Sequence, residues 1–114
     1  MKNDTQEWLA VQELRDALDK KFGQDIIVMD LSKLTTIADF FVIATGNSAP
    51  QLQALADTAE EIMKKHNIPL SHIEGVRAGE WVLLDFGSIL VHLFDKESRE
   101  FYKLERVWGD ANIV

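Results

Sequence analysis

The sequence predicts an α/β (α+β) fold, in which a mixed β-sheet of about five strands is flanked by helices. Two observations carry this prediction. Helical spacing of apolar residues alternates with short β-branched runs, and the predicted elements follow the order α-β-β-α-β-β-β-α. Hairpins combined with one strand–helix–strand crossover favour a sheet with parallel and antiparallel pairs. The 114 residues have the length of one domain, so we expect residues 1–114 to form a single domain.

The first predicted element is a helix over residues 4–22. Asp4 and Glu7 have the spacing of a capping box, and Gly23 stands where a left-handed residue would end the helix. The apolar stripe recurs at steps of three and four residues and consists of Trp8, Val11, Leu14, Leu18 and Phe22.

Two strands and a second helix follow along the chain. A β-branched run at residues 25–30 predicts one strand. A second strand is predicted at residues 39–44, and its unbroken apolar stretch after Asp39 indicates a central strand that is covered on both faces. Ser48 and Gln51 again have capping-box spacing, which predicts a helix that runs to about Lys65.

The C-terminal half is predicted to be rich in strands and to end in a helix. Residues 71–74, 80–84 and 89–94 predict three short strands, with a glycine-containing hairpin turn at residues 85–88. The last predicted helix covers residues 95–108. Its inward positions are expected to be Phe101, Leu104 and either Val107 or Trp108.

The charge of the chain is acidic and unevenly distributed. There are 12 Lys and Arg residues against 19 Asp and Glu residues, a formal net charge of −7. Residues 25–94 contain four basic and nine acidic side chains, so the middle of the chain carries −5 of this charge. The acidity argues against direct binding to nucleic acid and favours a basic partner or a cation. Solubility alone is the alternative explanation of the same composition.

Several classes of protein are excluded by simple absences in the sequence. Without cysteine, the chain has no disulfide, no thiol nucleophile and no cysteine-ligated metal. It begins with a polar segment in place of a secretory signal and has no apolar run of membrane-spanning length. We therefore expect a soluble, cytoplasmic protein that does not associate with a membrane.

Enzymatic and metal-binding interpretations have weak support in the residues. Gly46 and Ser48 lie in a strand-to-helix turn of the kind that opens nucleotidyltransferases, but an ordinary turn has the same composition. That chemistry needs paired carboxylates for a metal, and the next predicted strand offers Glu74 alone. Asp95 and Glu97 have suitable spacing, but they stand at a predicted helix start. We therefore expect no catalysis and no cofactor.

The three histidines do not have the spacing of metal ligands. His66 lies in the last turn of a predicted helix, where a cation suits the helix dipole. His72 and His92 lie on predicted strands, where a hydrogen-bonded sheet position is the more ordinary explanation. We therefore expect no bound metal.

A tryptophan on the predicted C-terminal hairpin is the strongest candidate for binding. One face of the hairpin carries Trp81, Leu83 and Asp85, and the other carries Glu80, Val82 and Leu84. If helices cover the second face, the first presents Trp81 among Glu74, Asp85 and His92. An aromatic anchor with charged neighbours is typical of binding hot spots. The residues by themselves leave open whether Trp81 is such an anchor or part of the core.

Three ordered blocks of residues resemble the ribosomal silencing factor family, also called the Iojap family. The first comprises residues 38–48, Gln51, 56–57 and 74–75; the second 79–81, 85–88 and 91–94; the third Arg99, 101–102, 104–105 and 108–111. The resemblance covers residues 25–111, nearly the whole chain. Two departures are the phenylalanines at positions 40 and 41, where the family often has a tyrosine, and Ser88, where it often has an aspartate.

The resemblance implies a nucleotidyltransferase-like fold without catalytic carboxylates, and a function that is not enzymatic. Family members bind a basic protein of the large ribosomal subunit, the fourteenth, and sterically block joining of the small subunit. They thereby repress translation when nutrients are short. Organellar relatives act in assembly of the large subunit, which is the alternative function. Members are often dimers, so a homodimer in isolation is a further expectation.

The resemblance also implies which residues bind the partner. The tryptophan of the family's glycine–acid–tryptophan motif corresponds to Trp81, and its neighbours on the sheet belong to the same surface. The expected partner-binding residues are Trp81, Asp85, Glu74, His92, Glu80 and Leu83.

Overall fold

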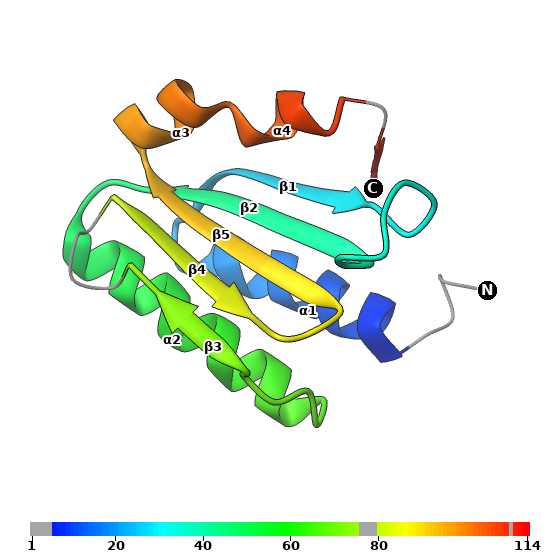
Figure 1. Cartoon of the computed structure of the whole chain (residues 1–114). Coiled ribbons are helices and arrows are strands. Elements are labelled where there is room, and N and C mark those ends of the chain that lie inside the picture. Colours follow the sequence, from blue (N-terminus) through cyan, green and yellow to red (C-terminus); the bar gives the residue numbers. More distant parts are fainter. Residues whose placement is uncertain (1–5, 76–79, 110) are drawn as a thin grey trace.

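The computed structural model describes residues 6–75, 80–109 and 111–114 (Figure 1). Its helices are α1 (Gln6–Lys20), α2 (Ala49–Lys65), α3 (Lys96–Tyr102) and α4 (Leu104–Val107). Its strands are β1 (Gln24–Asp30), β2 (Phe40–Gly46), β3 (His72–Glu74), β4 (Trp81–Asp85), β5 (Ile89–Asp95) and β6 (Asn112–Ile113).

The strands form one mixed sheet, which confirms the predicted fold class. In the described part of the chain the sheet has six strands in the order β3-β4-β5-β2-β1-β6. The central strands β2 and β5 are parallel, and the other neighbours are antiparallel. The prediction of about five strands missed β6, whose residues 112 and 113 pair with Met29 and Asp30. A strand of two residues is too short to show any periodicity.

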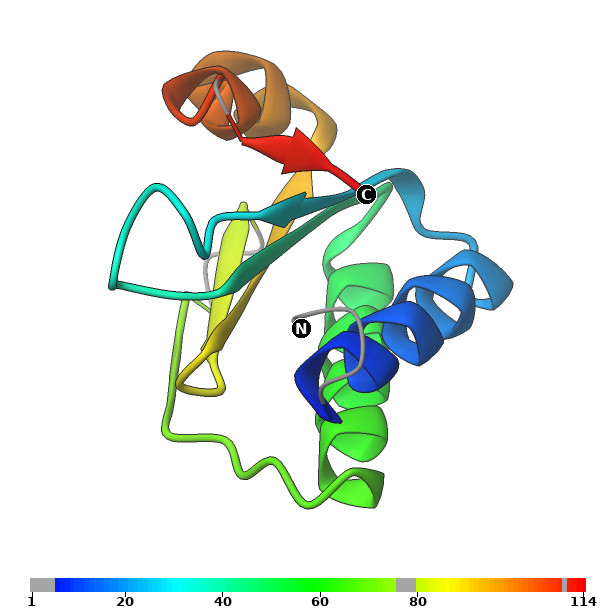
Figure 2. The same cartoon turned by 90° about the vertical axis from the view of Figure 1, so that its right-hand side faces the viewer.

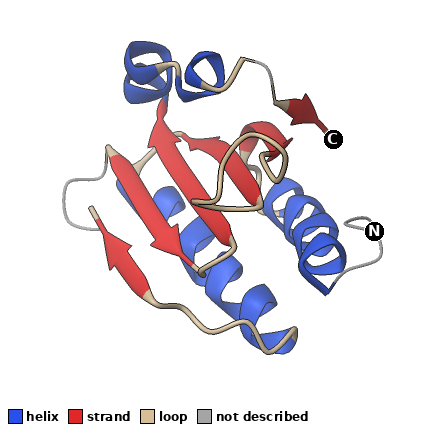
Figure 3. Ribbon diagram, turned by 45° about the vertical axis from the view of Figure 1, so that its right-hand side comes forward, coloured by secondary structure: helices blue, strands red, loops and turns tan. Residues whose placement is uncertain are grey.

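Helices lie on both faces of the sheet. The two long helices α1 and α2 lie side by side on one face, and the two short helices α3 and α4 lie on the other (Figures 1 and 2). Figure 3 shows the same division, with strands in red between the two groups of helices in blue. No helix in the described residues has the length and apolar character of a membrane span.

Strand β2 lies at the centre of the sheet and is buried along its whole length, as predicted. Because side chains alternate between faces, its residues supply two separate apolar clusters. Val42 and Ala44 belong to the cluster under α1 and α2, which also contains Leu84 and Val91. Phe41 and Ile43 belong to a second cluster on the other face, with Met29, Leu31, Ala38 and Phe94.

The predicted first helix is confirmed, but its C-terminal end differs from the prediction. Val11, Leu14 and Leu18 are fully buried, whereas Phe22 is 79% exposed. Phe22, with φ of 66°, adopts the left-handed conformation that was predicted for Gly23. Gly23 donates its N–H to the Leu18 carbonyl, and a Cβ at Gly23 would lie 3.0 Å from that oxygen. Gly23 is therefore required because the chain passes close to the Leu18 carbonyl, and not because of a left-handed conformation. The predicted cap at Asp4 lies outside the described residues.

The second helix begins and ends as its sequence signals predict. Ser48 is the N-cap, and its hydroxyl accepts a hydrogen bond of 3.2 Å from the Gln51 amide. The Gln51 side chain accepts from the amide of Asn47 and donates to the carbonyl of Phe22. Gln51 thereby joins the start of α2 to the turn after α1. At the other end, Asn67 takes a left-handed conformation with φ of 60°.

The prediction of one helix over residues 95–108 is wrong, because Lys103 adopts a left-handed conformation with φ of 46° and separates α3 from α4. Arg99 causes a second difference, since its buried guanidinium donates to Thr45 Oγ1 at 2.9 Å and to Glu105 at 3.1 Å. With Arg99 directed at the sheet, Phe101 and Val107 point outward and are 78% and 67% exposed. Two of the predicted inward residues do pack on the second cluster, namely Leu104 and Trp108.

Candidate protein-interaction face

The face of the sheet opposite α1 and α2 is only partly covered by α3 and α4. The side chains over β1, β2 and the end of β5 are buried in the second cluster. Towards the β3 edge the side chains become half-buried or exposed. We call this part the open face and define it by Glu74, Trp81, Leu83, Asp85 and Leu90.

Strand register brings the residues of the open face together. Glu74 is opposite Leu83, and Asp85 is opposite Leu90. Trp81 is opposite Phe94, next to the covered part of the face. Because residues directly opposite each other point to the same side of a sheet, three adjacent strands supply one continuous surface. Most of the predicted partner-binding residues therefore lie side by side.

Trp81 is at the border between the covered and the open parts of the face. Its ring packs on Phe94 at a centroid distance of 5.0 Å and on Tyr102 of α3 at 4.7 Å. The side chain is half-buried and contacts the second cluster. Trp81 is thus held by core residues on one side and accessible on the other, which combines the two alternatives that the sequence left open.

His92 is not a surface residue, contrary to the prediction that it lies exposed beside Trp81. It is 5% exposed, because the aromatic rings around it, Phe41, Trp81 and Phe94, cover it. The indole Nε1–H of Trp81 donates to His92 Nδ1 at 3.2 Å. Burial lowers the pKa of His92 from 6.5 to about 4, so the imidazole is neutral at pH 7.

Of the three predicted acids, Glu74 and Asp85 belong to the open face and Glu80 lies next to it. Glu74 is exposed and pairs with His72 at 2.8 Å. Asp85 is half-buried and accepts a hydrogen bond of 2.8 Å from Gly87 in the hairpin turn. Glu80 is exposed just before β4, where it lines a hollow of about 260 Å³ with Asp95, Glu97, Ser98, Phe101 and Tyr102. Glu74 and Glu80 therefore place negative charge near Trp81, whereas Asp85 lies at the opposite end of β4.

Two aromatic residues that extend this surface were not predicted to belong to it. Phe101 is 78% exposed, and Tyr102 is 45% exposed. Their rings meet edge to face with centroids 5.0 Å apart, and Tyr102 contacts Trp81. Helical periodicity assigned Phe101 to the core, because it cannot show that the helix turns Arg99 inward. The resemblance could have indicated both residues, since they form part of its third block.

Gly75 fixes the position of β3 against Trp81. It has a φ of +85°, and a Cβ at this residue would lie 1.9 Å from the Trp81 carbonyl oxygen. Both the left-handed conformation and the close approach require glycine. The contact borders a small hollow of about 210 Å³, lined by Glu74, Gly75, Trp81 and Leu83.

The residues considered for catalysis have structural partners. At the turn before α2, Ser48 caps the helix and a Cβ at Gly46 would lie 2.9 Å from Leu52. His66 pairs with Glu13 at 2.9 Å, whereas His72 and His92 bind the different partners given above. Among the residues that the structure describes, no three acidic or histidine side chains are grouped so that they could hold a metal.

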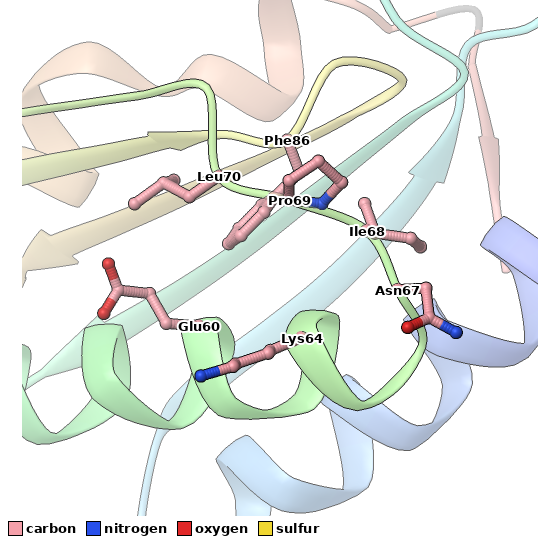
Figure 4. Close-up of a pocket in the computed structure, with 7 residues that line it drawn as sticks. All are labelled: Glu60, Lys64, Asn67, Ile68, Pro69, Leu70 and Phe86. Atoms are coloured by element: carbon pink, nitrogen blue, oxygen red, sulfur yellow. The ribbon is translucent and has the colours of Figure 1, made fainter.

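A further hollow in the described structure lies away from the open face. It measures about 540 Å³ and lies between the C-terminal part of α2, the connection to β3 and the β4–β5 turn (Figure 4). Glu60 and Lys64 come from α2, and Phe86 follows the opposite end of β4 from Trp81. The remaining lining residues are Asn67, Ile68, Pro69 and Leu70. None of the predicted partner-binding residues lines it.

Comparison with known proteins gives matches over most of the chain. The family described as "Ribosomal silencing factor during starvation" matches residues 2–114. The ribosomal silencing factor RsfS of Halalkalibacterium halodurans is 37% identical over 99 residues, which are 87% of this chain and 85% of that protein.

A solved structure and a more distant relative extend these similarities. The crystal structure of a protein from Chromobacterium violaceum superposes with a TM-score of 0.82 at 36% identity, and covers 89% of this chain and 85% of the other. A mouse protein named "Mitochondrial assembly of ribosomal large subunit protein 1" is 33% identical over 101 residues. That match covers 86% of this chain and 44% of the mouse protein.

Proposed function

This chain belongs to the ribosomal silencing factor family, and on that premise we propose that it represses translation by docking its open face on the large ribosomal subunit. The proposed contact is a basic ribosomal protein, the fourteenth of that subunit. The bound protein occupies space that the small subunit needs, so the two subunits fail to join. The family assignment supports the silencing role, and the open face supports the mode of contact.

The observation that carries the contact is the half-exposed Trp81 in acidic surroundings. Its inner side is fixed by Phe94 and Tyr102, so little side-chain entropy is lost when its outer side is covered. Large aromatic side chains in such positions dominate the energy of many protein interfaces. The proposed face therefore has an anchor that is already in place before the partner arrives.

Charge supports a basic protein as the partner. The chain has a formal net charge of −7; Glu74 and Glu80 lie next to Trp81, and Asp85 lies on the same face at the opposite end of β4. Acidic side chains attract a basic protein surface and repel the phosphates of ribosomal RNA. The same charges therefore favour one docking position over the many others that a ribosomal surface offers.

A subunit-joining assay tests this function. Purified large and small subunits are mixed with increasing amounts of the protein, and joined ribosomes are separated by sucrose-gradient sedimentation. We expect the protein to co-sediment with large subunits and joined ribosomes to decrease as its occupancy rises. Normal joining at saturating occupancy would exclude the silencing mechanism.

Assembly of the large subunit is the second candidate function. It is favoured by the similarity to the mouse protein, whose name refers to assembly of that subunit. Cells depleted of the protein distinguish the two functions. Accumulation of incomplete large subunits during growth supports assembly, whereas normal subunits with excessive joining during starvation support silencing.

Other expectations from the sequence stay predictions. These are a single domain over residues 1–114, a cytoplasmic location, the absence of catalysis and a homodimer in isolation. Light scattering of the purified protein, alone and with large subunits, would measure whether a dimer exists and whether it dissociates on binding.

A further inference from the structure

A buried histidine lies directly beneath the anchor of the open face. His92 is on β5, opposite Leu83 of β4 on one side and Ile43 of β2 on the other. Its ring is 4.7 Å from that of Phe41, and it is 5% exposed. Its Nδ1 accepts the hydrogen bond from the Trp81 indole at 3.2 Å. His92 therefore connects the anchor to the second cluster.

The protonation of His92 follows from this hydrogen bond. Because Nδ1 accepts, the proton of the neutral ring is on Nε2. Nε2 is buried and has no hydrogen-bond partner in the described part of the chain. A buried donor without an acceptor destabilises the folded state, and an apolar residue of similar shape would remove that cost. Stability alone therefore does not explain a histidine at this position.

The hydrogen bond to His92 fixes the orientation of the Trp81 indole ring, which its other contacts do not. Phe94 and Tyr102 contact the indole through aromatic rings, at interplanar angles of 32° and 48°. Such contacts tolerate rotation of the indole about χ2, because both of its orientations present an aromatic surface. A hydrogen bond donated by the Nε1–H distinguishes these orientations, since it needs a nearly linear N–H···N arrangement.

We propose that His92 is a positioning residue, which holds the Trp81 indole in the orientation that docks on the ribosomal protein. The inference rests on the proposed function of the open face. It assigns His92 an indirect role, because the imidazole is covered by other rings and Trp81 makes the contact. Fixing one orientation before binding reduces the entropy lost in the complex.

A double-mutant cycle tests the role of His92. His92→Phe removes the acceptor and keeps a ring, and Trp81→Phe removes the donor and keeps an aromatic surface. Affinity for purified large subunits is measured with a fluorescently labelled protein for each single variant and for the double variant. We expect His92→Phe to weaken binding by about fivefold, the equivalent of one ordinary hydrogen bond. In the Trp81→Phe background the same substitution is expected to have no effect.

Nuclear magnetic resonance of the free protein provides a second readout that needs no ribosome. The indole N–H resonance of Trp81 is identified by its loss in Trp81→Phe. It should shift in His92→Phe and should return towards its original position in His92→Gln, whose amide oxygen can accept the same bond. If wild-type protein fails to bind large subunits, the proposed function fails, while this resonance still tests the hydrogen bond separately.

Several results would overturn the inference. These are wild-type affinity of a folded His92→Phe variant, an equal loss of affinity in both backgrounds, or an unchanged indole resonance. If His92→Phe does not fold, Trp81→Phe tests the bond from its donor side at a half-exposed position. Wild-type affinity of Trp81→Phe would then overturn the proposal.

Discussion

The same strands supply side chains to both faces of the sheet, but the two faces differ in burial. On the face under α1 and α2, Val82, Leu84, Val91 and Leu93 are at most 2% exposed. On the other face, their neighbours Trp81, Leu83 and Leu90 are half-buried, and of these Trp81 packs on Tyr102 of α3. Alternation along β4 and β5 thus assigns one set of side chains to the core and the next set to a surface available for binding. Substitutions on the two faces should therefore have separable effects on stability and on affinity.

The largest expected effect is on the face under α1 and α2, which we call the closed face and which includes Val82, Leu84, Val91 and Leu93. Leu84→Ala should lower the free energy of unfolding by about 3 kcal/mol, because it removes buried methyl groups and leaves a cavity between the sheet and the helices. Urea denaturation measures this loss. Affinity for large subunits, corrected for the folded fraction, should be unchanged. A clear loss of affinity in the folded fraction would show that the two faces are not separable.

A decrease in pH should lower the free energy of unfolding by a comparable amount, because His92 is buried beneath the open face. The pKa of His92 falls from 6.5 to about 4 on folding, so the unfolded chain takes up a proton in this interval and the folded protein does not. The contribution of His92 to the free energy of unfolding is therefore fully present above pH 6.5. It decreases by about 3 kcal/mol as the pH falls towards 4.

Urea denaturation at pH 7 and pH 4, compared between wild type and His92→Phe, isolates this contribution. The two proteins share every other titrating group, so their difference in unfolding free energy should change by the stated amount. An equal pH dependence in both proteins would mean that His92 takes up its proton at pH 4 in the folded state as readily as in the unfolded chain.

Trp81→Ala should have the largest effect on binding. We expect affinity for large subunits to fall by about thirtyfold, or roughly 2 kcal/mol, because the anchor of the open face is removed. Phe22→Ala is a matched control, since Phe22 is an aromatic residue that is 79% exposed in the turn after α1. Circular dichroism verifies folding of both variants. Equal affinities of the two folded variants would remove Trp81 from the interface.

The smallest effect is expected from the charges around the anchor. Glu74→Lys should weaken binding by about threefold at low salt, and the difference should shrink as salt screens the charges. Glu61→Lys makes the same change of charge at an exposed position on α2, on the other side of the sheet. If both variants bind equally well at low salt, the acidity of the open face does not guide docking.

The closed face was also the face that the sequence predicted best. Val11, Leu14 and Leu18 recur at helical spacing, and the apolar run of β2 indicates a central strand. The spacing of apolar residues within one helix or strand indicates which of its sides is buried, so a local stretch of sequence is enough to predict it. The caps of α2 were likewise predictable, because Ser48 and Asn67 act on the backbone within their own turns.

The open face was predictable only in part, because long-range contacts decide its details. Alternation placed Trp81, Leu83 and Asp85 together, and Glu74 was also expected beside them. The register with β5 added Leu90, which was not predicted. The burial of His92 depends on rings contributed by three strands, which no local pattern records. The outward position of Phe101 depends on Arg99, whose partner Thr45 is 54 residues away in the sequence.

The contact between Gly75 and the Trp81 carbonyl affects how a mutational scan of this protein should be interpreted. Every side chain at position 75 would collide with that oxygen and displace either β3 or the start of β4. A scan that scores binding alone would therefore rank Gly75 with the partner-contacting residues, although it has no side chain to offer a partner. Scoring folding and binding in parallel would separate this indirect loss from the loss of a direct contact.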